Sequence, residues 1–354
     1  MRILVVGGAG YVGSTTVESL LEAGKEVTVY DNLSTGHAAS VADPARLVVG
    51  EMADKRRLEL LMREQRIDAV LHCAAKSLVG ESMADPGAYY RNNVAAGVAL
   101  LEAMKAAGVN RLVFSSTAAV YGEPRRVPIA EVDRTEPINP YGATKLAFEG
   151  AMRWFAAAHG FRAISLRYFN VAGATKRNGE DHHPETHLIP LVLRVAAGDA
   201  NHVQIYGQDY PTPDGTCIRD FVHVKDMALG HRLALEATAE GDPSLEVYNL
   251  GSAAGFSVRE VVEAARKVTG RAIPARALKR RTGDPPVLVA SSRRARRELG
   301  WSPRFSSLEQ MLADAWVWRQ AHPAGYADRG AGDSATEREG AMERVGAAAG
   351  VASV

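Results

Sequence analysis

Cysteine is scarce in this sequence. Cys73 and Cys217 are the only cysteines among 354 residues, and they lie far apart with no spacing typical of metal ligands. Two isolated thiols cannot form the disulfide framework of a small secreted protein, and they suit the reducing cytosol. The sequence therefore predicts a cytoplasmic protein with two reduced thiols and no metal site.

Long apolar runs are also missing, and so is an excess of charge of one sign. Met1-Arg2 leads directly into a strand-like run, with no stretch long enough for a signal sequence or a membrane-spanning helix. The 42 basic and 41 acidic residues leave a formal net charge of +1, which favours neither a nucleic acid nor an anionic membrane as partner. The basic run at 293–297 precedes apolar residues in an amphipathic segment, so we expect a solvated helix face there.

The first 32 residues carry the strongest pattern in the chain. An apolar run at 3–6 leads into four glycines, and a helix is expected at 15–23. Gly8 to Gly13 has the G-x-G-x-x-G spacing of a dinucleotide-binding turn, and a second register runs through Gly7, Gly10 and Gly13. Both registers predict a pyrophosphate at the positive N-terminal end of the helix.

An acidic residue lies where a dinucleotide-binding fold needs one. Residues 26–30 are predicted to form the second strand, and Asp31 at its end lies 18 residues beyond Gly13. A carboxylate at this place binds the adenosine ribose hydroxyls and repels the 2′-phosphate of NADP. Residues 32–36 offer no Arg or Lys to receive such a phosphate. The pattern therefore predicts NAD as the cofactor.

Strands and helices alternate from this point to residue 170. Strand cores are expected at 47–49, 69–71, 111–114 and 162–168, with helices at 54–66, 85–107 and 140–159. Alternation of this kind predicts an α/β fold with a Rossmann-type doubly wound parallel sheet and helices on both faces.

The regular alternation breaks down after Asn170. Prolines scattered over 184–213 and at 285–286 indicate long loops and short helices, so we expect a smaller α/β substrate-binding lobe. We therefore expect an NAD-binding domain at 1–175, to which the chain returns near 220–250. Residues 176–326 are expected to form mainly the substrate-binding lobe. Residues 327–354 have almost no large apolar side chains and are predicted to form a disordered tail.

A small group of residues is suited to acid–base chemistry. Tyr141 and Lys145 lie four apart on the expected helix at 140–159, so their side chains share one face. An ammonium beside a phenol stabilises the phenolate, as would a nicotinamide cation, and lets the tyrosine act as a base near neutral pH. Thr117 ends the preceding strand with a hydroxyl that can bond the same substrate oxygen. A lone Tyr-x-x-x-Lys is more often a core tyrosine beside a solvated lysine, but here the glycine turn and the hydroxyl precede it.

This order of glycine turn, strand-end hydroxyl and Tyr-x-x-x-Lys resembles the extended short-chain dehydrogenase/reductase superfamily over nearly the whole chain. Several blocks narrow the resemblance to the UDP-glucose 4-epimerases: 7–14, 31–33, 79–82, 92–94, 141–145, 167–170 and 214–220. The resemblance implies that Tyr141 is the proton acceptor, that Lys145 is its electrostatic partner and a ribose ligand, and that Thr117 is the hydroxyl at the sugar. Many relatives have Ser at the position of Thr117.

The resemblance also implies two sets of ligand contacts. Besides Thr117, Tyr141 and Lys145, the contacts to NAD are Gly7, Gly10, Tyr11, Val12, Gly13, Asp31, Asn32, Leu33, Ser34, Thr35, Gly36, Glu51, Met52, Cys73, Ala74, Ala75, Lys76, Ser77, Asn92 and Phe169. Glu51 replaces a common Asp, and Lys76 lies one residue from the usual place of a lysine. The contacts to a UDP-sugar are Thr117, Tyr141, Asn170, His187, Leu188, Gln204, Ile205, Tyr206, Arg219, Arg281, Asp284 and Leu288. His187 stands where Asn is common.

Two of the implied UDP-sugar ligands make chemical sense without the resemblance. The guanidinium groups of Arg219 and Arg281 match the oxygens of a diphosphate, although a single arginine is as often a plain surface charge.

Leu288 aligns with a position where a bulky Tyr excludes N-acetylated sugars in some relatives and a smaller Cys admits them in others. Leucine lies between the two in size.

The reaction implied is the interconversion of UDP-galactose and UDP-glucose through a 4-keto sugar, by hydride transfer to tightly bound NAD and back. The alternatives are a UDP-N-acetylglucosamine 4-epimerase, a nucleotide-sugar 4,6-dehydratase and a non-catalytic NAD-sensing regulator. Ala118-Ala119 argues against the dehydratase, which carries Asp-Glu there, and Tyr141 and Lys145 argue against the regulator. The resemblance also implies a homodimer in which the helices at 85–107 and 140–159 pair with their mates across a two-fold axis.

Overall fold

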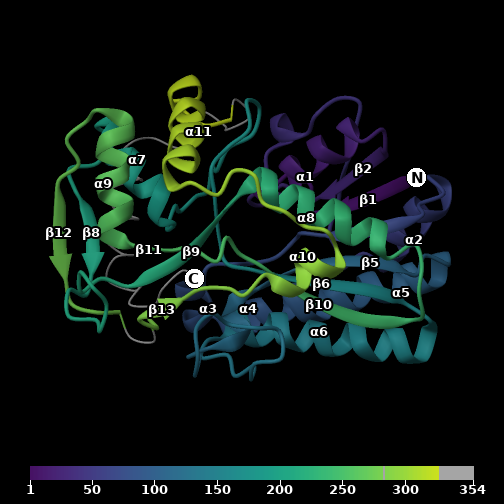
Figure 1. Ribbon diagram of the computed structural model, residues 1–354. Coiled ribbons are helices and arrows are strands. Elements are labelled where there is room, and N and C mark those ends of the chain that lie inside the picture. Colours follow the sequence, from purple (N-terminus) through teal and green to yellow (C-terminus); the bar gives the residue numbers. More distant parts are fainter. Residues whose placement is uncertain (282–283, 327–354) are drawn as a thin grey trace.

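A seven-stranded parallel sheet dominates the molecule, which we describe from a computed structural model for residues 1–281 and 284–326. Its strand order is β10-β6-β5-β4-β1-β2-β3 (Figure 1). The bounds are β1 Arg2–Val6, β2 Glu26–Asp31, β3 Arg46–Val49, β4 Ala69–His72, β5 Arg111–Thr117, β6 Arg162–Tyr168 and β10 Ser244–Leu250. The predicted Rossmann-type α/β fold is confirmed. The tail predicted at 327–354 lies outside the described residues.

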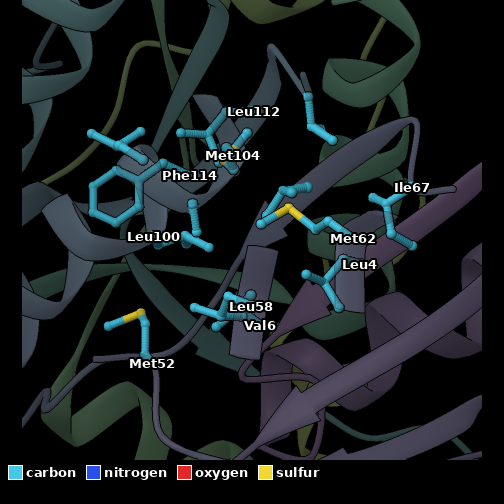
Figure 2. Close-up of a cluster of buried hydrophobic side chains, with 14 of the residues drawn as sticks. Leu4, Val6, Met52, Leu58, Met62, Ile67, Leu100, Met104, Leu112 and Phe114 are labelled. Carbon is cyan, nitrogen blue, oxygen red and sulfur yellow. The ribbon is translucent and has the colours of Figure 1, made fainter. Parts of the chain in front are cut away.

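Helices cover both faces of this large sheet because each strand sends alternate side chains to opposite faces. Ile3 and Val5 of β1 pack in a core with α1, α8 and α10, while Leu4 and Val6 pack in a second core with α2, α5 and α6 (Figures 1 and 2). The helix bounds are α1 Tyr11–Glu22, α2 Lys55–Glu64, α5 Ala96–Ala107, α6 Pro140–His159, α8 Val224–Ala237 and α10 Arg293–Glu298.

Helix α6 begins and ends where the sequence predicts, because both ends have local signals. The Asn139 side chain accepts a hydrogen bond from the backbone N–H of Gly142 at 2.8 Å, and Pro140 occupies the first helical turn. Gly160 ends the helix in the left-handed region, with φ of 72°. The candidate catalytic residues on α6 therefore rest on a helix with a fixed start.

Two other helices differ from their predictions. Helix α1 begins at Tyr11 instead of Thr15, because the last glycine of the turn, Gly13, already belongs to the first helical turn. The helix predicted at 85–107 is α4 Pro86–Tyr89, a π-helical turn at Tyr90–Ala95 and then α5, with the short α3 Val79–Ala84 before them. A π-helical turn rotates the side chains that follow it relative to a regular helix. Asn93 in this turn reaches the backbone of Lys76 and the Thr144 hydroxyl.

A second group of strands, which we call the small region, lies at the far end of the molecule from β1 (Figure 1). Its central strand β9 pairs in parallel with β7 and β13 and antiparallel with β11, while β8 pairs in parallel with β12. The bounds are β7 Asn170–Ala172, β8 Val203–Tyr206, β9 Ile218–His223, β11 Gly255–Ser257, β12 Ala275–Leu278 and β13 Val287–Leu288. Helices α7 Leu188–Ala197, α9 Val258–Thr269 and α11 Leu308–Ala321 share an apolar core beside them.

The chain crosses between the two regions more than once. Strand β10 returns to the large sheet and pairs with β6 after β7, β8 and β9 have been formed. The division of function at residue 175 stays a prediction. No helix in the described part of the chain has the length and apolarity that crossing a bilayer would need.

Candidate active site

The glycine turn after β1 is packed so closely that side chains are excluded. Gly7 has φ of 81°, and a Cβ atom there would lie 2.3 Å from the backbone nitrogen of Ala74. A Cβ at Gly13 would lie 2.1 Å from the Gly7 carbonyl oxygen, whereas one at Gly10 would meet only that oxygen, at 3.6 Å. Gly10 precedes α1 without a side-chain cap, so no side chain of the cap residue occupies the first N–H groups of the helix. The turn therefore fits a pyrophosphate.

Asp31 ties the next predicted NAD contacts to this turn. Its carboxylate accepts hydrogen bonds from the backbone N–H groups of Ala9 at 3.0 Å and Leu33 at 2.9 Å. Burial raises the pKa of Asp31, and these amides oppose the rise. Asn32 donates to Glu51 at 3.2 Å, so the acid that replaces the common Asp supports the 31–36 loop. The structure brings the glycine turn, Asp31 and residues 32–36 together.

The segment that follows β4 forms the neighbouring wall. Because β1, β4 and β5 are adjacent and parallel, their carboxyl ends lie at one edge of the large sheet. The N–H groups of Cys73 and Ala74 donate to the Val6 carbonyl at 2.8 and 3.0 Å. Asn93 holds the backbone of Lys76 at 2.9 Å, and Asn92 donates to Asn93 at 2.9 Å. The predicted set at 73–77 and Asn92 therefore belongs to the same edge.

Thr117, Tyr141 and Lys145 meet at the end of β5. All are buried, with 4%, 7% and 3% of their surface exposed. The Thr117 side chain lies beside the Tyr141 phenol and lowers its pKa. The Lys145 ammonium donates to the Ser115 carbonyl at 2.8 Å and lies 5.9 Å from the centre of the Tyr141 ring. The three residues that the sequence analysis grouped also lie together in the structure. A substrate hydroxyl could reach both Thr117 and Tyr141 there.

Burial dominates the electrostatics of this group. Burial raises the pKa of Tyr141 to about 12, and the neighbouring Thr117 side chain only partly opposes this rise. It also lowers the pKa of Lys145 to about 8, against the effects of Cys73 and Glu149. The expectation that Lys145, together with a nicotinamide cation, brings the Tyr141 pKa toward neutrality stays a prediction for the loaded enzyme. Removal from water destabilises the phenolate by more free energy than an ammonium several ångströms away contributes to its stability.

A buried ion pair supports this group, and the sequence reasoning missed it. Arg167 on β6 donates to Glu149 on α6 at 2.6 Å, with 6% and 2% of their side chains exposed. Glu149 also accepts from Ser116 at 2.6 Å and from Ser165 at 2.8 Å. Glu149 follows Lys145 by one helical turn on the same buried face, and that spacing was the signal available in the sequence. The pair fixes α6 against the strand ends.

The predicted substrate residues of the small region come from several strands. Asn170 on β7 and Arg219 on β9 belong to one sheet, in which Arg219 lies opposite Leu288 on β13. Leu288 is 2% exposed and packs in an apolar cluster with Phe169 and with Ala118, the residue after Thr117. This cluster links the small region to the end of β5.

Two arginines share one aspartate. Arg219 donates to Asp284 at 2.9 Å and to the Pro285 carbonyl at 2.9 Å, and it is 7% exposed. Arg281 donates to the other oxygen of Asp284 at 3.2 Å and lies over the Tyr206 ring at 4.4 Å. Tyr206 in turn donates to Gln204. The structure brings these residues together, with both guanidinium groups anchored by the same carboxylate.

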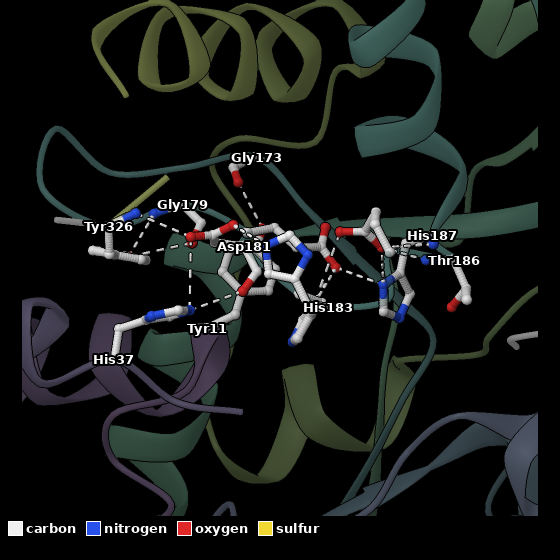
Figure 3. Close-up of polar contacts among 12 residues, drawn as sticks. Tyr11, His37, Gly173, Gly179, Asp181, His183, Thr186, His187 and Tyr326 are labelled. Carbon is white, nitrogen blue, oxygen red and sulfur yellow. Dashed lines mark hydrogen bonds and ion pairs between the residues drawn. The ribbon is translucent and has the colours of Figure 1, made fainter. Parts of the chain in front are cut away.

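His187 and Leu188 lie at the start of α7. The His187 Nδ1 atom is 2.8 Å from carboxylate oxygens of both Glu180 and Glu185 (Figure 3). Burial disfavours the protonated ring, but Glu180 and Glu185 outweigh burial and raise the pKa of His187 well above its usual value. His182 and His187 together lower the pKa of Glu180 to about 2, against burial. His187 thus faces carboxylates of its own chain, a contact that the sequence did not predict.

Known proteins match this arrangement over most of the chain. Residues 3–251 match the NAD dependent epimerase/dehydratase family. The UDP-glucose 4-epimerase of Lacticaseibacillus casei is 51% identical over 331 residues, which are 93% of this chain and 100% of the relative. The chain belongs to the NAD dependent epimerase/dehydratase family. Its predicted enzyme class and its predicted cofactor NAD are confirmed.

Solved structures of this epimerase/dehydratase family share the fold. The UDP-glucose 4-epimerase of Brucella ovis, in complex with NAD, is 44% identical with a TM-score of 0.86, covering 89% of this chain and 97% of that one. The enzyme of Bifidobacterium longum, in complex with NAD+ and UDP, is 37% identical with a TM-score of 0.87, covering 92% and 100%. The glycine turn and Asp31 of the present chain fit the cofactor that these structures hold.

Proposed function

We propose that this enzyme is a UDP-glucose 4-epimerase, which interconverts UDP-galactose and UDP-glucose. The observation that carries the proposal is the meeting of Thr117, Tyr141 and Lys145 at the sheet edge that also holds the glycine turn. Relatives of the same name at 51% identity support it. The roles of the individual residues below are part of the proposal.

Tyr141 takes the proton of the sugar 4-hydroxyl and later returns it. Bound NAD supplies a reversible acceptor for the hydride of C4. Thr117 holds the sugar oxygen next to the phenol, so that the proton can pass directly between the two oxygens. The buried ammonium of Lys145, anchored at the Ser115 carbonyl, favours the phenolate. Because the pKa of Tyr141 is raised to about 12 in the chain alone, the proposal requires a lower value in the loaded enzyme.

The small region holds the part of the substrate that stays fixed. In this proposal Arg219 and Arg281 bind the diphosphate, while Leu188 and the side chains of β8 contact the nucleotide. The aspartate between the arginines keeps their guanidinium planes in place. A 4-keto sugar can then turn about its link to the diphosphate and present its other face, which reverses the configuration at C4 when the hydride returns.

One assay separates this function from its alternatives. The purified enzyme is incubated with UDP-galactose without added NAD, and the products are resolved by chromatography. We expect UDP-glucose to accumulate to an equilibrium, because the cofactor is regenerated in each cycle. A 4-keto-6-deoxy sugar would identify a dehydratase instead. That outcome is disfavoured because Ala118 and Ala119, 1% and 4% exposed, occupy the positions of the required acids.

The non-catalytic regulator is excluded by the same assay if product forms. Protein that binds NAD and UDP-galactose but forms no product within hours would overturn the proposed function. Bound NAD is measured in parallel, from the absorbance of the cofactor released on denaturation. This second readout distinguishes an enzyme that has lost its cofactor from one that lacks the activity.

The enzyme is further proposed to act as a homodimer through the helical segments at 85–107 and 140–159. Tyr90 at the start of the π-helical turn is 46% exposed and Trp154 on α6 is 74% exposed, so both offer large apolar surfaces to a second copy. Light scattering is expected to give the mass of two chains at micromolar concentration. Trp154→Glu should shift the mass toward one chain. A wild-type mass of one chain would contradict the dimer.

A cytoplasmic location is also proposed. Cys73 and Cys217 are both free thiols in the structure, which suits a reducing compartment. Fractionation of the source cells, followed by detection of the protein with an antibody, tests this location. Recovery in a membrane or extracellular fraction would contradict it.

A further inference from the structure

Four side chains with nitrogen and oxygen donors gather in the segment between β7 and α7. Glu180, His182, Glu185 and His187 each offer one ligand atom, and these atoms lie within 4.8 Å of one another. The sequence analysis interpreted this stretch as part of the looser substrate-binding lobe and singled out only His187 in it, as an implied UDP-sugar contact. The fold of the segment alone brings the four residues together.

The donor atoms converge on one point. Oε1 of Glu180 lies 3.3 Å from Nδ1 of His182 and 2.8 Å from Nδ1 of His187. Glu185 completes the group, with Oε1 at 2.8 Å from the His187 Nδ1 and Oε2 at 4.0 Å from the His182 Nδ1. The two imidazole rings are 5.2 Å apart between centroids. Nitrogen and oxygen donors therefore alternate around a small shared volume.

One of these atoms is buried without a hydrogen bond. Nδ1 of His182 is shielded from solvent and forms no hydrogen bond to any described residue, although Glu180 lies 3.3 Å away. A buried polar nitrogen of this kind costs free energy unless something satisfies it. A cation between His182 and the two carboxylates would satisfy it.

The carboxylates are already oriented. Oε1 of Glu185 accepts from the backbone N–H groups of Thr186 at 2.7 Å and His187 at 2.8 Å. The neighbouring Asp181 accepts from the N–H of Tyr326 at 3.0 Å and contacts His37, which fastens the segment to two distant parts of the chain (Figure 3). Supporting hydrogen bonds of this type hold metal ligands in place.

From this geometry we infer that Glu180, His182, Glu185 and His187 bind one divalent transition-metal ion, for which Zn²⁺ is the best match. Imidazole nitrogen and carboxylate oxygen are both Zn²⁺ ligands, whereas Mg²⁺ and Ca²⁺ prefer oxygen donors alone. Donor atoms in a tetrahedral zinc site are about 3.4 Å apart, so the atoms joined by the 2.8 Å His187 hydrogen bonds move apart and the wider pairs move closer when the ion replaces those bonds.

Charge supports the same inference. The side chains of Glu180 and Glu185 are only 9% and 7% exposed, so two negative charges are nearly removed from water. The imidazoles, at 25% and 28%, leave a route for an ion from solvent. The site fastens the residues before α7 and takes no part in hydride transfer. Because His187 is also an implied UDP-sugar contact, the metal test is run without substrate, so that its outcome does not depend on the proposed function.

The test uses the full chain, expressed without a histidine tag. The protein is stripped with EDTA, exposed to Zn²⁺ or Mg²⁺, desalted and analysed by mass spectrometry for metal content. We expect about one zinc per chain and no retained magnesium, with a rise in the thermal midpoint of roughly 5 °C on adding Zn²⁺. Wild-type protein that retains no zinc would overturn the inference.

Matched variants locate the ion. His182→Gln should weaken zinc binding by roughly 100-fold or more, because it removes a ligand from the metal itself. His183→Gln is the control, since His183 is the adjacent histidine, is 52% exposed and lies outside the group. Equal zinc retention by the two variants would overturn the site even if the wild type binds zinc.

A spectroscopic readout remains if His182→Gln does not fold. Co²⁺ is added to the stripped wild-type protein and its visible absorption is recorded. A tetrahedral site with nitrogen and oxygen donors gives an intense band, and Zn²⁺ added afterwards should abolish it. The weak spectrum of hexahydrated Co²⁺ would count against the inference.

Discussion

The large sheet and the small region hold their polar residues in different ways. Thr117 ends β5 and Tyr141 lies in the first turn of α6, so a strand of the large sheet and a helix that covers it fix the two residues. In the small region Arg219 and Asp284 lie 65 residues apart in sequence and are held by a long-range ion pair. The difference suggests a division of labour: the large sheet positions the chemistry, and the small region binds the part of the substrate that does not react. Substitutions in the first should lower kcat, and those in the second should raise KM.

The largest effect is expected for Tyr141→Phe. Removal of the proton acceptor should lower kcat by roughly 10³-fold and leave KM and bound NAD nearly unchanged. Steady-state kinetics with UDP-galactose measures both constants. Tyr89→Phe is the matched control, because the Tyr89 ring is 6.5 Å from that of Tyr141 and its hydroxyl bonds Leu78 and Glu81 instead. Near-normal turnover in Tyr141→Phe would remove this residue from the chemistry.

The second effect concerns the breadth of substrates. Leu288 leaves more room than a tyrosine, so the wild type should epimerise UDP-N-acetylglucosamine measurably but more slowly than UDP-galactose. Leu288→Tyr should lower the N-acetyl activity by roughly 10- to 200-fold and spare UDP-galactose. Leu288→Cys should raise it. If the wild type shows no N-acetyl activity and Leu288→Cys creates none, Leu288 does not control access.

A smaller effect is expected for Arg219→Lys. The lysine keeps the charge but loses the planar fork that spans a diphosphate, so KM for UDP-galactose should rise roughly tenfold with little change in kcat. Arg280→Lys serves as the control, since Arg280 pairs with the exposed Asp209 at the surface of the same region. A fall in kcat without a change in KM would break the proposed division of labour.

The smallest effect concerns acid stability, where the two regions also differ. Burial lowers the pKa of His72 in the large sheet to about 3, whereas the carboxylates beside His187 raise its pKa. A neutral buried His72 stabilises the fold above pH 6.5, and this contribution is lost as the pH falls toward 3, because the unfolded chain takes up the proton first. At pH 5 the loss amounts to about 2 kcal/mol.

His72→Leu should therefore reduce the loss of stability between pH 7.5 and pH 5 by about that amount. Urea unfolding at both pH values measures it. His159→Leu is the control, because His159 is exposed at the end of α6. Identical pH slopes in wild type and His72→Leu would show that His72 is not the group that titrates.

Local signals explain which parts of the fold were predictable. The bounds of α6 follow from Asn139 and Pro140 at its start and from Gly160 at its end. Each of these residues acts only on the helical turn next to it. The sequence did not predict that α4, a π-helical turn and α5 follow one another. Asn93 in this turn bonds Lys76 and Thr144, which lie on segments remote in sequence. The same holds for β8 and β12, which pair although some 70 residues of chain separate them.

The candidate site shows the same limit. The sequence order placed Thr117, Tyr141 and Lys145 together, but the pKa of Tyr141 depends on burial, which only the fold reveals. The buried Glu149–Arg167 pair and the group at 180–187 were missed for a related reason. Charges in a sequence are expected to be solvated, and nothing local indicates that the fold removes them from water.

The late return of β10 has a consequence for the way the chain reaches its native state. Until residues 244–250 are in place, β6 is an open edge whose backbone N–H and C=O groups can pair with any passing strand. The chain between β6 and β10 includes β7, β8 and β9, so closure of the large sheet waits for a long, non-local loop. During synthesis from the ribosome, we therefore expect the nucleotide-binding half to be exposed to aggregation until β10 has paired with β6.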